Sequence, residues 1–88
     1  MLDVRYSGQF KKDMKTCTRR RYDLELLKPV IDTLRIPAPL PSQYRNHNLS
    51  GQYSGYQECH VTPDWLLIYQ YRDGELLLYR TGTHSDLF

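Results

Sequence analysis

The stretch of sequence that decides the fold is WLLIYQYRDGELLLYRT, residues 65–81. It contains two runs rich in aromatic and branched apolar residues, 65–71 and 75–81, joined through Asp73 and Gly74. An Asp-Gly pair between two such runs is a strong sequence signal for a tight β-hairpin. The pattern therefore predicts two antiparallel strands, and a similar run over 53–61 predicts a third strand before them.

Two-residue loops would fix how these strands pair. With Asp73-Gly74 as one loop, the expected facing pairs are Arg72–Glu75, Tyr69–Leu78, Leu67–Arg80 and Trp65–Gly82. With Thr62-Pro63 as the other, they are Val61–Asp64, His60–Trp65 and Glu58–Leu67. Facing residues share a side of the sheet.

This register predicts one polar and one apolar face of the sheet. The polar face carries Glu58, His60, Trp65, Leu67 and Arg80. The apolar face, which suits contact with helices, carries Cys59, Val61, Leu66, Ile68, Leu77 and Tyr79. A shift of one residue in either pairing would exchange the two faces.

The chain before the sheet predicts a short strand and a first helix. Residues 2–6 alternate between apolar and polar positions, and Ser7 is a candidate N-cap. Phe10, Met14 and Cys17 then recur at helical spacing, which predicts a helix that ends within 19–22.

A second helix is expected over 24–34, capped by Asp23. Pro29 lacks an N–H group, so it predicts a bend near Lys28 or a helix that begins there. Residues 36–41 contain three prolines and predict an extended connector to a surface loop through Tyr44 and His47; a docking segment for an SH3-type domain is the alternative.

Length and composition limit the chain to one small domain, residues 1–88, of the α+β class with a small antiparallel sheet and two N-terminal helices on one face. The element order is β-α-α-β-β-β. Cys17 and Cys59 are too few and too far apart for a disulfide framework or a zinc site. No apolar stretch approaches the about 18 residues that a membrane helix requires, so a reduced, cytoplasmic protein without a membrane partner is expected.

The net charge of +2 hides a strongly basic run in the first helix. Its members are Lys11, Lys12, Lys15, Arg19, Arg20 and Arg21. Such a run can bind a phosphate backbone, or it can be an ordinary solvated helix face.

All three histidines, His47, His60 and His84, lie in the second half of the chain. Imidazoles placed together with a carboxylate and a cation, here Asp64 and Arg80, suit general acid and base chemistry near neutral pH. Each residue also has a structural explanation: His60 as a hydrogen-bonded imidazole, Asp64 as a turn residue, and Arg80 as the partner of Glu58 across the strands. The histidines lack the spacing of a metal site.

The chemistry that fits this set is phosphodiester transfer on RNA. A base removes the proton of the 2′-hydroxyl, a cation stabilises the charge on phosphorus, and an acid protonates the 5′-oxygen. An aromatic side chain can stack on an unpaired base.

The run from His47 to Phe88, with HNLSGQYSGYQECHVTPDWLLIY and RTGTHSDLF, resembles the YafQ branch of the RelE-type toxins of bacterial toxin–antitoxin systems. Tyr6-Ser7-Gly8-Gln9 and Pro39-Leu40-Pro41 fit the same family. The resemblance implies a ribosome-dependent mRNA interferase, an endoribonuclease that cleaves mRNA in the ribosomal A site without a metal or other cofactor.

The resemblance also implies roles for individual residues. The expected catalytic residues are His47, His60, Asp64, His84 and Arg80, with Arg80 on the phosphate, and Trp65 and Phe88 would support substrate placement. For Lys11, Lys12, Lys15 and Arg19, the position on the first helix suggests contact with ribosomal RNA.

The partners implied by the resemblance are a cognate antitoxin of the DinJ-like, ribbon-helix-helix kind, the ribosome and mRNA. Operator DNA would be reached only through the antitoxin complex. The competing class is a binder without catalytic activity, either a ParE-like gyrase inhibitor or an antitoxin-bound corepressor. A gyrase inhibitor would have no reason to keep three histidines and an aspartate near one end of a sheet.

Overall fold

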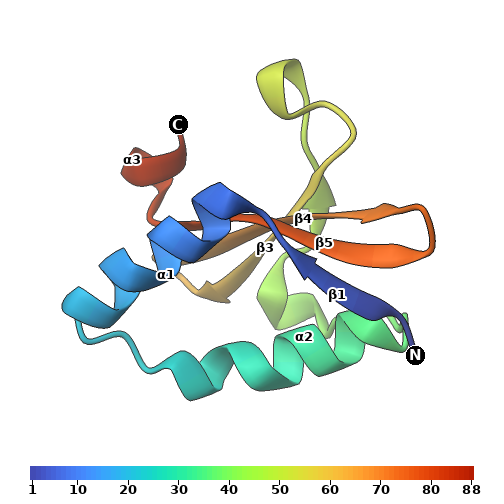
Figure 1. Ribbon diagram of the computed structural model, residues 1–88, viewed down its shortest axis with the longest axis horizontal. Helices are drawn as coiled ribbons and strands as arrows, with labels where there is room; N and C mark the ends of the chain where they lie inside the picture. The colour runs from blue at the N-terminus through green and yellow to red at the C-terminus, as the bar shows by residue number, and fades with distance from the viewer.

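A five-stranded sheet in the order β1-β5-β4-β3-β2 forms the centre of the computed structural model, which describes residues 1–88 (Figure 1). The strands are β1 (Asp3–Tyr6), β2 (His47–Asn48), β3 (Gln57–Thr62), β4 (Trp65–Arg72) and β5 (Glu75–Gly82). The last four strands pair antiparallel, whereas β1 lies parallel to β5. The predicted α+β class is confirmed, and the predicted hairpin is the pair β4–β5.

Two helices follow β1 and precede the other four strands, as predicted. Helix α1 (Gly8–Arg19) begins after Ser7, whose Oγ accepts a hydrogen bond from the backbone N–H of Phe10 at 2.9 Å. Helix α2 (Leu27–Arg35) follows a 3-10 turn, η1 (Leu24–Leu26), capped by Asp23. Pro29 therefore lies in the first turn of α2, where a backbone N–H has no helical partner to lose. Of the two expectations for Pro29, the helix that begins close to it is confirmed.

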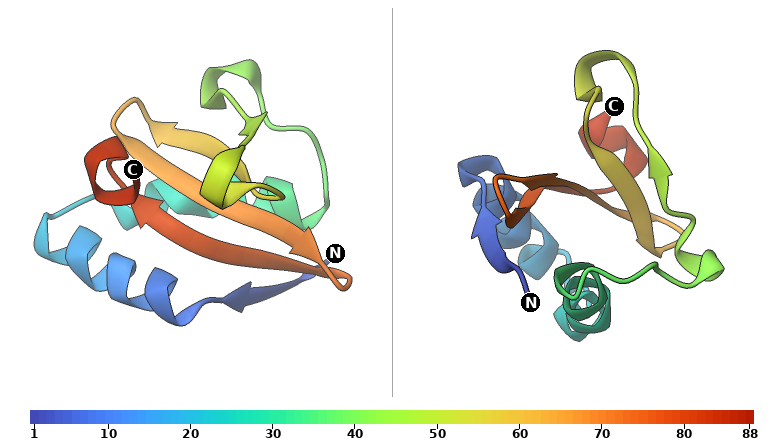
Figure 2. Two further views of the ribbon diagram at one scale, coloured as in Figure 1. Left: turned by 90° about the horizontal axis from the view of Figure 1, so that it is seen from above. Right: turned by 90° about the vertical axis from the view of Figure 1, so that its right-hand side faces the viewer.

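Both helices cover one face of the sheet, where a core of twelve buried residues lies between them and the strands (Figure 2). The helices contribute Phe10, Cys17, Leu27, Val30 and Leu34. The strands contribute Cys59, Val61, Trp65, Leu67, Tyr69, Leu76 and Leu78. A smaller core on the opposite face contains Tyr53, Leu66, Ile68 and Leu87. Buried side chains therefore pack on both faces of the sheet.

The β4–β5 register is as predicted near the hairpin loop and wrong beyond it. Arg72 faces Glu75 and Tyr69 faces Leu78, but the pairs that follow are Ile68–Arg80, Leu67–Thr81 and Leu66–Gly82. The expected Leu67–Arg80 and Trp65–Gly82 pairs do not form, because the register shifts by one residue at Tyr79. A β-bulge of this kind has no signal in the hydrophobic pattern.

The β3–β4 register is also displaced from the prediction. The loop is Pro63-Asp64 rather than Thr62-Pro63, so that Thr62 faces Trp65, and a second irregularity follows at Val61. The remaining pairs are His60–Leu66, Cys59–Leu67 and Glu58–Ile68. The expected Val61–Asp64, His60–Trp65 and Glu58–Leu67 pairs are therefore wrong. As a consequence, Trp65 and Leu67 lie on the helix face, and Leu66 and Ile68 lie on the face opposite the helices.

Four short elements, η2, β2, η3 and α3, are not among the helices and strands that the sequence predicted. The expected strand over 53–61 begins only at Gln57, because Gly51–Tyr53 form a 3-10 turn, η3. Another 3-10 turn, η2, is formed by Ser42–Tyr44. His47, expected in a loop, belongs to β2 and faces Glu58 of β3. After β5 the chain forms one more turn of helix, α3 (His84–Leu87).

Candidate active site

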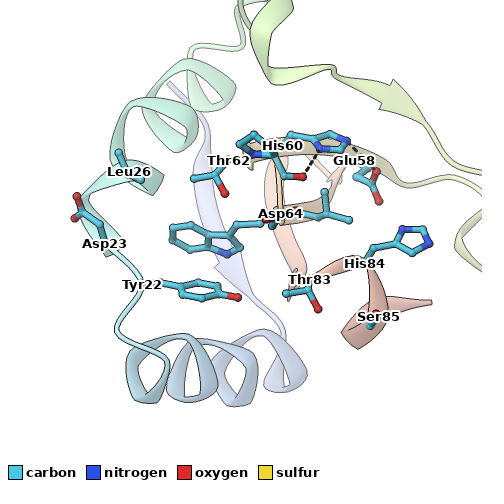
Figure 3. A pocket seen from close by; sticks show the side chains of 13 residues that line it. Tyr22, Asp23, Leu26, Glu58, His60, Thr62, Asp64, Thr83, His84 and Ser85 are labelled. Carbon is cyan, nitrogen blue, oxygen red and sulfur yellow. Dashed lines mark hydrogen bonds and ion pairs between the residues drawn. The ribbon is translucent and has the colours of Figure 1, made fainter.

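An open cleft of about 860 Å³ lies at the end of the sheet, bounded by β3, the Pro63-Asp64 turn, α3 and the segment between α1 and η1 (Figure 3). Its acidic and imidazole side chains are those of Asp23, Glu58, His60, Asp64 and His84. His60 and Glu58 border it from the sheet, and His84 borders it from α3. The fold therefore brings together residues from separate parts of the chain.

Glu58 links two of the predicted histidines; the sequence placed it on the polar face with His60 but not among the expected catalytic residues. Its Oε1 lies 3.4 Å from Nε2 of His47 and 3.7 Å from Nε2 of His60. Glu58 is 5% exposed, so this carboxylate is buried behind two more exposed rings. The available signal was its place two residues before His60, since alternate residues of a strand share a face.

The other nitrogen of each ring faces a backbone carbonyl. Nδ1 of His47 lies 2.9 Å from the carbonyl oxygen of Arg45, and Nδ1 of His60 lies 3.4 Å from that of Pro63. A carbonyl oxygen can only accept, so each contact favours the tautomer with a hydrogen on Nδ1. Each ring is thus oriented from one side by the backbone and from the other by Glu58.

His84 and Phe88 are placed by the turn of helix that ends the described chain. Thr83 caps α3 in a capping box with Asp86, and the ring of His84 stacks on that of Phe88 with centroids 4.8 Å apart. The hydroxyl of Tyr53 donates to the carbonyl of Leu87 at 2.8 Å. Phe88 is 51% exposed, so its ring offers a free surface beside His84.

Asp86 also fastens α3 to the end of α1. Arg20 donates to its two carboxylate oxygens at 2.6 Å and 3.0 Å, and these bonds, with that from the Thr83 backbone, hold the pKa of Asp86 well below its usual value. Gly82 allows this arrangement, because a Cβ at that position, where φ is +155°, would lie 2.8 Å from Asp86 Oδ2. Arg20 therefore differs from the rest of the basic run in having a carboxylate partner.

Arg80 pairs with Asp13 of α1 rather than with Glu58. Its Nε and Nη2 both donate to the Asp13 carboxylate at 3.0 Å, and the Thr81 backbone N–H donates to the same group at 3.1 Å. These bonds raise the pKa of Arg80, so it remains a cation. The structure places Arg80 beside α1, outside the residues that line the cleft.

Trp65 lies on the helix face, contrary to the predicted polar face. It is 3% exposed, its Nε1 donates to Thr81 Oγ1 at 2.7 Å, and its ring lies 5.0 Å from that of Tyr22. The reason is the one-residue displacement of the β3–β4 register. Trp65 thus forms part of the wall of the cleft and part of the core at once.

The predicted basic residues Lys11, Lys12, Lys15 and Arg19 are exposed on α1 and do not line the cleft. Together with His47, whose contact with the site runs through Glu58, they are predicted site residues outside the cleft itself. His60, Asp64 and His84 meet within it. None of the helices is long and apolar enough to cross a membrane.

Residues 2–88 match the family model described as the bacterial toxin YafQ of type II toxin–antitoxin systems. The chain belongs to the YafQ family. It is 45% identical, over 98% of its length and 95% of the relative's, to the mRNA interferase toxin YafQ of Escherichia coli K12. The E. coli DinJ-YafQ complex contains a chain of the same fold, with a TM-score of 0.90 at 44% identity over 100% of this chain and 99% of that one.

A metal-bound toxin from Helicobacter pylori has the same fold, with a TM-score of 0.93 at 40% identity over 100% of both chains. In the present YafQ-family chain, no three His, Cys, Asp or Glu side chains gather as a set of metal ligands.

Proposed function

We propose that this chain is an mRNA interferase toxin that cleaves mRNA in the ribosomal A site by attack of a ribose 2′-hydroxyl on the adjacent phosphate. One observation carries the proposal: two imidazoles that share a buried carboxylate lie at the same end of the sheet as Asp64 and His84, around an open cleft. The 45% identity to an mRNA interferase supports it independently.

The reaction requires two proton transfers and no oxidant or metal. A base removes the 2′-hydroxyl proton, the oxygen forms a bond to phosphorus, and the bond to the 5′-oxygen breaks as an acid protonates that leaving group. His47, His60, Asp64 and His84 are the acid and base residues. His60 and Asp64 border the cleft from β3 and the turn after it, and His84 borders it from α3, which suits a reaction with protons moving at opposite sides of one phosphorus (Figure 3).

The remaining predicted residues bind and place the RNA. Arg80 stabilises the charge that develops on the phosphate, and Asp13 keeps it a cation in place. The exposed ring of Phe88 stacks on a base, and Trp65 supports the cleft wall from the core. Lys11, Lys12, Lys15 and Arg19 bind ribosomal RNA from the outer face of α1.

The proposed partner that holds the toxin inactive is a DinJ-like antitoxin, since a relative at 44% identity forms a DinJ-YafQ complex. Operator DNA is reached only through that complex, and the site of action is the cytoplasm, where ribosomes and mRNA meet. The residues 1–88 act as one domain.

The products of cleavage test the mechanism. Attack by the 2′-hydroxyl leaves an upstream fragment with a 2′,3′-cyclic phosphate or a 3′-phosphate, and EDTA at levels that keep ribosomes intact does not inhibit. Replacing the single ribose on the 5′ side of the cut by 2′-deoxyribose abolishes cleavage and preserves binding. Fragments with a 3′-hydroxyl and a 5′-phosphate contradict this mechanism. Absence of any cleavage on translating ribosomes supports a toxin-fold binder instead.

A further inference from the structure

Glu58 is the most deeply buried ionisable side chain at the cleft, with 6% of its side chain exposed. Its Oε2 is buried without a hydrogen-bond partner, so its only polar contacts are those of Oε1 with the rings of His47 and His60. A buried carboxylate without hydrogen-bond donors is costly. The stability of this arrangement therefore depends on hydrogens supplied by the two rings.

The hydrogen positions on the rings decide what those contacts are. The carbonyl oxygens favour the tautomer with a hydrogen on each Nδ1, because a carbonyl can only accept. In that tautomer a neutral ring presents the lone pair of Nε2 to the carboxylate, whereas a protonated ring presents an N–H. Protonation of the ring therefore makes the 3.4 Å contact between His47 and Glu58 favourable.

We propose that Glu58 is a positioning residue, which orients His47 and His60 and stabilises whichever ring carries the transferred proton. This rests on the proposed RNA cleavage, in which a ring becomes protonated as a base or begins protonated as an acid. In both cases the charged ring lies against the carboxylate, and an adjacent opposite charge favours it.

One carboxylate between two rings also couples them. The ring centroids of His47 and His60 lie 6.4 Å apart, so a proton on one disfavours a proton on the other, while Glu58 offers the same oxygen to both. With one proton between them, the two rings comprise one that can give a proton and one that can accept it.

The other ionisable groups near Glu58 are the same in the wild type and in a variant at this position. Asp23, Asp64 and His84 line the same cleft, and none of them is bonded to Glu58. Cys59 lies on the helix face; burial, with a smaller contribution from the charge of Glu58, raises the pKa of its thiol to about 12. Replacing Glu58 alone therefore isolates its effect on the rings.

The variant Glu58→Gln keeps the size and the oxygen of the side chain and removes its charge. In the free toxin, NMR titration of the ring protons is expected to move the midpoints of His47 and His60 to lower pH, because their protonated states lose the carboxylate. The midpoint of His84 is the internal control and stays in place. Glu75→Gln, at a partly exposed carboxylate paired with Arg5 at 3.1 Å, is the matched control and moves none of the three.

Cleavage on ribosomes is the second measurement. Glu58→Gln is expected to lower kcat by about 10- to 100-fold, the usual effect of losing a residue that orients catalytic groups, with KM unchanged. Glu58→Asp keeps the charge and recovers part of the rate. If Glu58→Gln does not fold, Glu58→Asp replaces it and is expected to show the same shifts at smaller size.

Unmoved midpoints of His47 and His60 in a folded variant, or an unchanged kcat, overturn the role of Glu58. The titration needs no RNA, so it separates this inference from the proposed function. Shifted midpoints in a toxin whose wild type cuts no RNA leave the coupling intact and refute the function. Normal cleavage by the wild type together with unmoved midpoints in Glu58→Gln supports the proposed function and refutes the role of Glu58.

Discussion

The individual side chains of the site lie on different elements, and the backbone of each element sets their positions. His60 lies on β3, Asp64 in the turn after it, and His84 on α3. Contacts with backbone carbonyls and with Glu58 set the directions of the His47 and His60 rings, and the ring of His84 stacks on Phe88. Because these positions are at the ends of elements and partly exposed, side chains can be removed there without a large cavity in the core.

Asp64→Ala and His84→Ala are expected to abolish growth inhibition and to leave the fold and antitoxin binding intact. Loss of acid or base participation lowers the rate by typically 10²- to 10⁴-fold. The measurement is growth after induction at matched expression, with thermal unfolding and antitoxin titration alongside. Ser85→Ala, on the same turn of helix and lining the same cleft, is the control. Full toxicity of both folded variants would refute the proposed chemistry.

At the element scale, α1 has two sides with different charges. Inside, Asp13 binds Arg80 and Thr81 of β5, and at the end of the helix Arg20 binds Asp86 of α3. Outside, the lysines are exposed. The basic run of the sequence is therefore not uniform, because Arg20 contributes to placing His84 and the lysines are free to bind another molecule.

The double substitution Lys12→Ala and Lys15→Ala is expected to weaken ribosome association and to flatten its dependence on salt. Each phosphate contact releases counterions when it forms, so fewer are released when two contacts are missing. The slope of log affinity against log salt should fall by about 0.7 to 0.9 for each contact removed. Lys28→Ala with Arg72→Ala, which removes the same charge from α2 and β4, is the control. An unchanged slope would identify the lysines as an ordinary solvated face.

At the scale of the whole molecule, local patterns in the sequence predict the elements better than their alignment. The hairpin at Asp73-Gly74, the N-cap at Ser7 and the two helices depend on neighbouring residues, and the structure confirms them. The bulge at Tyr79 and the displaced turn at Pro63-Asp64 depend on contacts across the sheet. These two shifts move Trp65 into the core and explain why its predicted face was wrong.

The candidate site was partly predictable for the same reason. The clustering of His60, Asp64 and His84 follows from their places at strand ends, which survive a shift of one residue. The contact of His47 with Glu58 requires the two-residue strand β2, which is too short for a periodic signal. Likewise, the buried Asp13 is an acidic residue within a basic run, and only the fold brings it to Arg80.

Asp13→Asn is expected to lower the free energy of unfolding by about 1.5 to 3 kcal/mol, the range for hydrogen bonds to charged groups. An amide has one acceptor oxygen, so it cannot accept both hydrogen bonds that Arg80 donates to the Asp13 carboxylate. The side chain is only 7% exposed, so water does not replace the lost bond. Urea unfolding with an unchanged m-value measures this loss. Asp32→Asn, at an exposed pair on α2, is the control and should change stability little. Equal stability of the two variants would contradict the proposed weight of the Asp13 contact.

The parallel pairing of β1 with β5 joins residues 3–6 to residues 75–78, the first strand of the described chain to the last. During synthesis β1 and the helices emerge well before β5 does, and the edge that β1 needs does not yet exist. The central β4–β5 pair, the Asp13–Arg80 bond and α3 all wait for the same late segment. The cleft at the end of the sheet is therefore assembled only after this late segment has left the ribosome, and a nascent chain that lacks the segment has no complete site.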